Sequence, residues 1–370
     1  MNGTKDPVPS WDGSARIPSL DGLRAVSILL VLWTHFVPTI VDRGSAFWIR
    51  TARETQIGVD VFFVISGFLI TLLLLRESDR TGSISLRGFF ARRALRLLPA
   101  FAAYLGFVGV YAGLGYARVN ATDWVMATTY TTDFVALLGR GAPWVFAHLW
   151  SLAVEEHFYV VWPIALVALG RRRAVTALMI TLALSPAMRV FLWAEFPWPV
   201  MCGLLKFITL ARLDPVAAGC LLAYVVQDPA SLSFRRPSGR ADVVRWVAAA
   251  VLVGSAVGLT AAGFFEVAIR ATIKAGVIAS LVHYAVTRPA SLSGRLLNSR
   301  PMTALGLLSY SLYLWQQPFL DRTGPLRMSR WPANLPLAFA CAVASYLLIE
   351  RPFLGLKHRL GRPAPTYLPR

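Results

Sequence analysis

The chain has 370 residues, of which 56% are apolar and only 15% are charged. A soluble domain carries roughly 25% charged residues, so this composition excludes an ordinary soluble enzyme. The formal net charge is +18, but most basic residues separate the apolar runs and do not form one basic face. We therefore exclude a nucleic-acid-binding protein, which needs a basic face on a water-soluble fold. The composition predicts a multi-pass protein of the cytoplasmic (inner) membrane, in contact with membrane lipids.

Ten apolar runs are expected to form membrane-spanning helices, because about 20 apolar residues in a helix cross the hydrocarbon core. The segment 123–138 is a weaker candidate, because its threonines and two aspartates make a full span costly. We interpret that segment as an interfacial or re-entrant piece. The predicted fold is therefore an all-α, polytopic helical bundle. Its expected spans cover residues 22–40, 58–75, 89–111, 150–169, 174–193, 208–226, 243–262, 267–286, 303–320 and 335–349.

The basic residues also predict the orientation of the chain. Loops that would lie on the same side as the N-terminus carry most of the Lys and Arg residues, which favours both termini in the cytoplasm. We expect a single membrane domain, 1–370, with a polar N-terminal tail at 1–19 and a basic C-terminal tail at 351–370. The first apolar run lacks a small-residue cleavage site, so we expect it to remain as a membrane helix.

Ionisable side chains inside apolar runs are candidates for function, because burying them in a membrane is costly. Arg24 and His35 lie in the first run, eleven residues apart. At 100° per residue this spacing places both on one helix face, roughly 16 Å apart along the axis. A neutral imidazole inside the bilayer can accept a proton. The alternative is a histidine that is hydrogen-bonded to a neighbouring helix.

Two further motifs lie at the starts of apolar runs. Asp60 belongs to the stretch 58–68, whose two glycines allow neighbouring helices to approach closely. Arg92, Arg93 and Arg96 cluster at the start of the third run, and guanidinium groups bind phosphates well. The structural alternatives are a helix-packing motif with a capping aspartate, and a set of positive anchors at the membrane surface.

The fourth run opens with an unusual density of ionisable groups. Two adjacent carboxylates, Glu155 and Glu156, are accompanied by His148 and His157. Surface solvation does not readily explain this density, and the neighbouring aromatic residues fit a membrane interface. A functional site and a structural ion pair between Glu156 and His157 both remain open.

Polar side chains also occur near the ends of the last two runs. The stretch 309–318 contains Tyr313 and Gln316, and the final run ends with Glu350 and Arg351, which could be a juxtamembrane pair. The sequence has no Gly-rich phosphate loop, no metal-binding histidine pair and no nucleophile elbow, so we expect no metal. The residues alone predict an intramembrane base and a cytoplasmic anion site, which suit transfer of a group from a phosphate-bearing donor.

Taken together, these motifs resemble the acyltransferase 3 family of membrane O-acyltransferases, from Leu20-Asp21-Gly22-Leu23-Arg24 to Glu350-Arg351-Pro352-Phe353. The resemblance implies about ten helices and an acyl-CoA donor, with acetyl-CoA expected. It also implies an Arg-x10-His motif, matched by Arg24 and His35, and an arginine-rich motif, matched by Arg92, Arg93 and Arg96. Acceptors in the family are hydroxyls of envelope glycans, lipid-linked sugars or antibiotics. Gln316 stands where the family commonly has His, and His157 where it commonly has Gln.

The resulting hypothesis is acyl transfer from cytosolic acyl-CoA to a hydroxyl, with His35 as general base. Arg92, Arg93 and Arg96 would hold the CoA phosphates, and Arg24 would bind phosphate or orient the inner cavity. Asp60 or Glu155 would orient His35 or bind the acceptor. The residues expected to line the acceptor pocket are Glu156, His157, Tyr313 and Gln316.

Several alternatives to this hypothesis stay open. The rival function is a glycan or lipid transporter, or flippase, without CoA chemistry. A scaffold or sensor with an inactive site is a third reading. Direct transfer is favoured over a covalent relay because no serine or cysteine stands out as a nucleophile. The acceptor's identity, the length of the acyl chain and the oligomeric state are not defined by the sequence.

Overall fold

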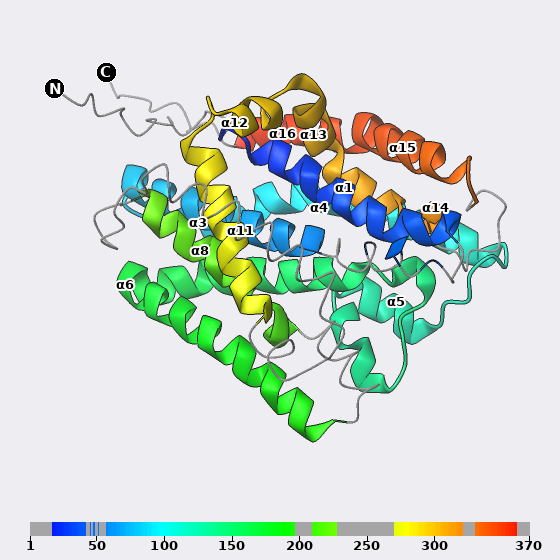
Figure 1. The fold of residues 1–370 in the computed structure, drawn as a ribbon, viewed down its shortest axis with the longest axis horizontal. Coiled ribbons are helices and arrows are strands. Elements are labelled where there is room, and N and C mark those ends of the chain that lie inside the picture. The colour runs from blue at the N-terminus through cyan, green and yellow to red at the C-terminus, as the bar shows by residue number, and fades with distance from the viewer. Residues whose placement is uncertain are drawn as a thin grey trace, which may run out of the picture.

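The computed structural model describes residues 17–41, 45, 47–48, 51, 57–196, 209–227, 270–320 and 330–360. Within these ranges the regular structure is entirely helical, so the prediction of an all-α fold is confirmed (Figure 1). The principal helices are α1 (Leu20–Ile40), α3 (Ile57–Thr81), α4 (Leu86–Gly113), α6 (Leu149–Glu195), α8 (Asp214–Gln227), α11 (Arg270–Thr287), α13 (Arg300–Trp315) and α15 (Asn334–Ser345). Shorter elements are α5 (Ala121–Thr128), η1 (Thr132–Leu138), η2 (Trp144–Phe146), η3 (Thr209–Arg212), α12 (Leu292–Leu297), α14 (Gln317–Leu320), the π-helical η5 (Tyr346–Glu350) and α16 (Arg351–Leu360).

Within the described residues, five helical stretches are long and apolar enough to cross a membrane. They are Leu20–Ile40, Ile57–Thr81, Leu86–Gly113, Trp144–Glu195 and Asn334–Leu356. The chain is therefore a membrane protein. The expected span 243–262 lies outside the described residues, whereas helices occupy the other expected ranges in whole or in part. Ten spans and cytoplasmic termini stay predictions.

The long helix α6 is folded into two arms. Gly170 has φ 71° and ψ 168°, a conformation that side chains with a Cβ rarely adopt, and the two arms meet there (Figure 1). Arg171 follows directly and donates to the carbonyl oxygen of Leu75 at 2.9 Å and to the carboxylate of Asp79. The arms correspond to the separately expected spans 150–169 and 174–193. The turn is thus fixed against the end of α3.

Small residues allow the helices to pack closely. A Cβ on Gly306 of α13 would overlap the carbonyl oxygen of Asp21 on α1, and a Cβ on Gly67 of α3 would overlap that of Val216 on α8. A Cβ on Gly58 would approach the Ser27 carbonyl oxygen within 2.6 Å. Backbone contact through small residues is typical of membrane helices. These contacts bring α1 against α13 and α3, and α3 against α8.

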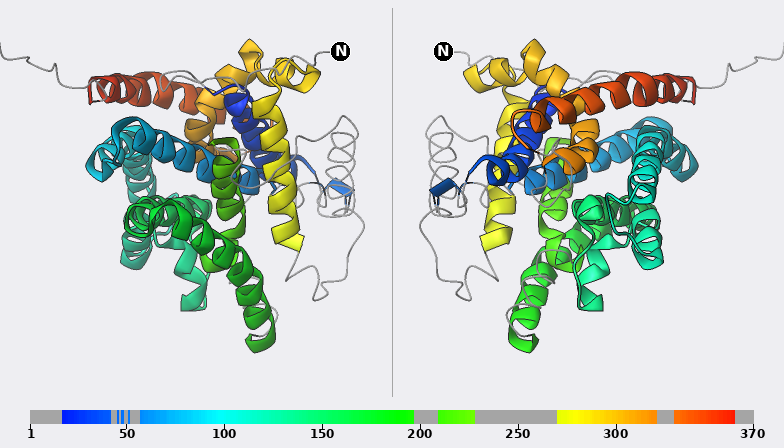
Figure 2. Two further views of the ribbon diagram at one scale, coloured as in Figure 1. Left: turned by 90° about the vertical axis from the view of Figure 1, so that its left-hand side faces the viewer. Right: turned by 90° about the vertical axis from the view of Figure 1, so that its right-hand side faces the viewer.

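Two regions differ from uninterrupted spans. The segment 123–138 forms the short elements α5 and η1, in which Asp123 completes a capping box with Asn120, so it is not one continuous helix. The last helix continues through η5 and α16 to residue 360, beyond the expected end at 349 and into the expected tail. Figure 2 shows α15 and α16 along one side of the bundle, with the second arm of α6 projecting from the opposite side.

Candidate functional site

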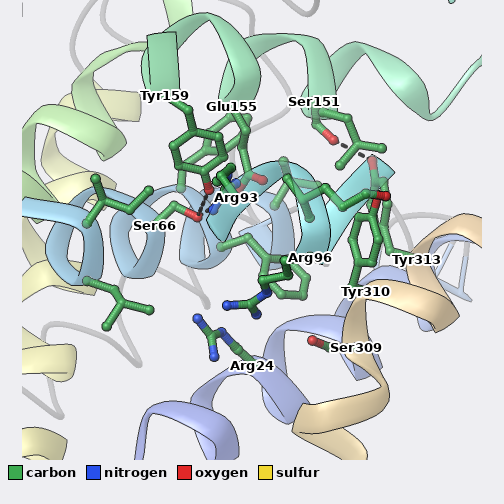
Figure 3. Close-up of a pocket in the computed structure, with 17 residues that line it drawn as sticks. Arg24, Ser66, Arg93, Arg96, Ser151, Glu155, Tyr159, Ser309, Tyr310 and Tyr313 are labelled. Carbon is green, nitrogen blue, oxygen red and sulfur yellow. Dashed lines mark hydrogen bonds between the residues drawn. The ribbon is translucent and has the colours of Figure 1, made fainter. Parts of the chain in front are cut away.

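A cavity of about 80 Å³, lined by both polar and apolar side chains, lies among α1, α3, α4, the first arm of α6 and α13 (Figure 3). Five of the residues predicted from the sequence line this cavity: Arg24, Arg93, Arg96, Glu155 and Tyr313. The other lining residues are Val59, Phe62, Phe63, Ser66, Leu69, Ile70, Leu97, Ser151, Leu152, Tyr159, Ser309 and Tyr310. The structure therefore gathers side chains that are almost 300 residues apart in the sequence.

Arginines form one end of the cavity, which we call the arginine end. The guanidinium groups of Arg24 and Arg96 point toward one another in Figure 3. Arg24 is paired with Asp21 at 3.2 Å, whereas Arg96 donates no hydrogen bond to any residue in the described part of the chain. Two facing cations repel each other unless an anion lies between them. The arrangement therefore suits an anionic group, and phosphate oxygens match guanidinium donors well.

Arg93 is held by an aromatic ring and a carboxylate. Its guanidinium carbon lies 3.0 Å from the centre of the Tyr159 ring, and its Nη2 lies 3.8 Å from Glu156. Glu156 therefore contacts a residue that lines the cavity but is not itself a lining residue. Arg92, on the same helix, forms an ion pair with Glu77 at 3.2 Å and does not line the cavity.

Glu155 belongs to a short hydrogen-bonded chain along the cavity wall. Ser66 donates to Glu155 at 2.8 Å, and the Tyr159 hydroxyl donates to Ser66 at 2.7 Å (Figure 3). This chain fixes the carboxylate position across two helices. Ser66 and Tyr159 were not among the site residues predicted from the sequence; Tyr159 lies one helical turn after Glu155, and the packing of α3 beside α6 brings Ser66 to both.

At the other end of the cavity lie Ser151 and Tyr313, and we call this the tyrosine end. The Tyr313 hydroxyl donates to the backbone oxygen of His148 at 2.7 Å and also bonds the Ser151 hydroxyl. The rings of Tyr313 and His148 are 5.5 Å apart, and His148 is 3% exposed. His148 was not among the site residues predicted from the sequence.

His35 is not a lining residue of the cavity, but Val31 and Leu32, which precede it on α1, pack in the same apolar cluster as Tyr313. His35 interacts electrostatically with His148. Its Nδ1 is 3.0 Å from the carbonyl oxygen of Val31. Because a carbonyl oxygen only accepts, this contact assigns the proton to Nδ1 and leaves Nε2 able to accept one. Arg24, which shares a helix face with His35, does line the cavity.

Two predicted residues lie away from the cavity. Asp60 pairs with Arg212 at 3.4 Å and with Lys274 at 3.2 Å, so two cations share its carboxylate. His157 Nδ1 lies 3.0 Å from the Thr209 hydroxyl. Neither residue is brought to Glu155 or Tyr313, because each faces other helices.

His157, Thr209 and Asp133 form a polar cluster that is separate from the cavity. The Nδ1 of His157 also lies 3.6 Å from Asp133, whose carboxylate accepts a hydrogen bond from Thr209. Burial raises the pKa of the Asp133 carboxyl above its ordinary value.

Glu350, at the end of η5, accepts a hydrogen bond from Ser311 and interacts electrostatically with Arg96.

Comparison with known proteins identifies the family. A family profile described as an acyltransferase domain, acyltransferase 3, matches residues 17–350. The chain is 27% identical to the peptidoglycan O-acetyltransferase OatA of Listeria monocytogenes, over 91% of this chain and 55% of that protein. It is 30% identical to a Bacillus subtilis protein named "Putative peptidoglycan O-acetyltransferase YrhL", over 91% of this chain and 54% of that protein.

The chain therefore spans just over half the length of these relatives. No solved structure matches it. The family match covers all five of the helices that build the cavity: α1, α3, α4, α6 and α13. The chain belongs to the acyltransferase 3 family, as its motifs had indicated.

Proposed function

We propose that this protein is a multi-pass O-acyltransferase of the cytoplasmic membrane. It moves an acetyl group from cytosolic acetyl-CoA to a hydroxyl of an envelope glycan. The observation that carries the proposal is the cavity that joins arginines at one end to the hydroxyl groups of Ser151 and Tyr313 at the other. The relatives named as peptidoglycan O-acetyltransferases favour a glycan acceptor over an antibiotic or a lipid-linked sugar.

The arginine end is the proposed donor site. Arg24, Arg93 and Arg96 bind the phosphates of CoA, whose negative charge offsets the repulsion between the facing guanidinium groups. Arg92 is left out of this set because its guanidinium is paired with Glu77 outside the cavity. The pantetheine arm then extends from the arginine end toward Tyr313.

His35 is the proposed general base. Its Nε2 accepts the proton of the acceptor hydroxyl while the hydroxyl oxygen attacks the thioester carbonyl carbon. The carbon–sulfur bond breaks, CoA leaves as the thiolate, and the proton on His35 returns to the sulfur. Glu155, fixed by Ser66, orients groups within the cavity. Asp60 is assigned a structural role, because its carboxylate forms ion pairs with Arg212 and Lys274.

The proposed acceptor pocket is formed by residues near the tyrosine end. Tyr313 lines the cavity there, and Gln316 lies less than one helical turn beyond it. Glu156 contributes through its ion pair with Arg93. His157 is kept out of the proposed acceptor pocket, since its ring bonds Thr209.

The test is thiol release from acetyl-CoA by the purified protein in lipid nanodiscs, with and without soluble peptidoglycan fragments. We expect release that depends on the acceptor and is abolished in His35→Gln, with acetyl-CoA still bound. The matched control is His157→Gln, which replaces a histidine away from the cavity and should keep the activity. A glycan transporter would neither bind acetyl-CoA nor release thiol, and that result would replace the enzyme by the transporter.

A further inference from the structure

Two buried side chains near the tyrosine end have no polar partner. His148 is 3% exposed, and both of its ring nitrogens lack a hydrogen bond within the described part of the chain. Gln316 is 0% exposed, and both its amide nitrogen and its amide oxygen lack one as well. Buried polar atoms in folded proteins are almost always hydrogen-bonded, so four such atoms in one region call for an explanation.

Helix geometry aims Gln316 toward the side of α13 that faces the cavity. Ser309 lines the cavity, and Gln316 follows it by seven residues. Seven residues are two turns less about 20°, so both side chains leave α13 in nearly the same direction. Gln316 therefore lies on the face that lines the cavity, about 10 Å further along the helix.

The chain segments that carry these side chains lie next to each other. Tyr313 donates to the backbone oxygen of His148 at 2.7 Å, and Gln317 donates to that of Trp144 at 2.9 Å. Gln316 falls between these two contacts in sequence. His35 interacts electrostatically with His148, so the proposed base belongs to the same region.

Aromatic packing fixes the His148 ring. The Tyr104 ring meets it edge-on, with centroids 5.4 Å apart and planes at 89°. Tyr104 is itself held, because its hydroxyl donates to the Val145 oxygen at 2.6 Å. The hydroxyl hydrogens of Ser151 and Tyr313 are used in the hydrogen bond between these two groups and in the bond from Tyr313 to the His148 backbone oxygen. The imidazole of His148 is therefore a rigid group with its hydrogen-bonding capacity unused.

We propose that His148 and Gln316 form the acceptor site, where they bind uncharged hydroxyls of a sugar ring and hold one of them beside His35. An uncharged imidazole offers one donor and one acceptor, and a glutamine amide offers both kinds as well. Hydroxyl groups also donate and accept, so they satisfy both members of the pair. A phosphate or carboxylate would use only the donors and leave the acceptors facing negative charge. The inference rests on the proposed function and names its acceptor chemistry.

No bond changes at either residue in this assignment. The acceptor proton moves to His35, and His148 and Gln316 keep their protons while they position the hydroxyl. Both are therefore positioning residues that contact the acceptor. Their loss should affect use of the acceptor and leave binding of acetyl-CoA unchanged.

The first arm of the test is thermal stability in detergent without ligands. Replacing an unpartnered buried polar group by an apolar one of similar shape is neutral or stabilising. We expect His148→Phe and Gln316→Leu to keep or raise the Tm. The matched control is Gln317→Leu, which removes a glutamine that is hydrogen-bonded to the Trp144 oxygen and should lower the Tm. A fall in Tm for Gln316→Leu as large as that for Gln317→Leu would overturn the proposal.

The second arm is thiol release from acetyl-CoA in nanodiscs, with chitotetraose as an uncharged acceptor and glucose 6-phosphate as a charged one. We expect release with chitotetraose, an increase of at least tenfold in its KM for Gln316→Leu, and partial rescue by Gln316→His. Use of glucose 6-phosphate alone, or unchanged KM and kcat in both variants, would contradict the assignment. If wild-type protein releases no thiol with either acceptor and binds no acetyl-CoA, the proposed function fails instead. If it binds acetyl-CoA but uses neither acceptor, the stability comparison decides.

Discussion

Arg96 is the residue whose replacement gives the sharpest test of the donor site. It lines the cavity, faces Arg24 and donates no hydrogen bond to the described residues around it. A hydrogen bond between charged groups contributes about 1.5–3 kcal/mol. Since about 1.4 kcal/mol corresponds to a factor of ten in Kd, Arg96→Gln should weaken acetyl-CoA binding by about 10- to 100-fold.

The same substitution should not destabilise the empty protein. Neutralising Arg96 removes its repulsion with Arg24 and Arg93 together with its weaker attraction to Glu350, so the Tm without ligand should stay the same or rise. Titration calorimetry in nanodiscs gives the Kd, and a fluorescence melt gives the Tm. Arg92→Gln is the control, because it removes an equal charge from the same helix outside the cavity.

Two results would refute the reasoning. An unchanged Kd in Arg96→Gln would show that the arginine end does not hold the donor. An equal weakening in Arg92→Gln would show that binding follows the total charge of α4 and not the geometry of the cavity. A lower Tm together with weaker binding would point to a structural part for Arg96.

Three further predictions concern the frame of the site. Ser66→Ala removes the donor that fixes Glu155 and should lower kcat by about five- to tenfold while the acetyl-CoA Kd is unchanged, measured by steady-state thiol release; an unchanged kcat would show that Glu155 needs no such support. Gly306→Leu should abolish the folded protein on size-exclusion chromatography, because a side chain there would overlap the α1 backbone, whereas Gly276→Ala, with open space around it, should fold normally. Asp60→Asn leaves two cations without their shared carboxylate and should cost about 3 kcal/mol of stability by chemical denaturation, and retention of full stability would contradict a structural part for that carboxylate.

The helices were largely predictable because long apolar runs specify them. The break at Gly170 also had a sequence signal, since the glycine and three following arginines interrupt an apolar stretch. The common helix face of Arg24 and His35 followed from their spacing, and Arg24 does line the cavity. Periodicity along one chain segment was sufficient for these features.

The arrangement between helices was not predictable in the same way. Arg92 and Arg96 are one turn apart, yet Arg92 pairs with Glu77 and only Arg96 reaches the cavity. Which arginine enters the cavity depends on the orientation of α4 within the folded bundle. Asp60 illustrates the same limit, because its partners come from segments more than 150 residues away. The absence of hydrogen-bond partners for the ring of His148 could be found only in the folded structure, because it depends on which residues pack around that ring.

The π-helical turn η5 restricts how this chain can vary in evolution. A π turn holds one residue more than an α-helical turn, and it joins α15 to α16 at Glu350. If the same residues formed a regular α-helix, the one additional residue would rotate all that follows by about 100°. That rotation would carry Glu350 away from Ser311 and would misalign α16 against α4, the helix that bears Arg93 and Arg96. Substitutions that convert this turn to regular α-helix without changing its length should therefore be rare among homologues that keep the arginine end, even though its side chains are mostly ordinary apolar residues.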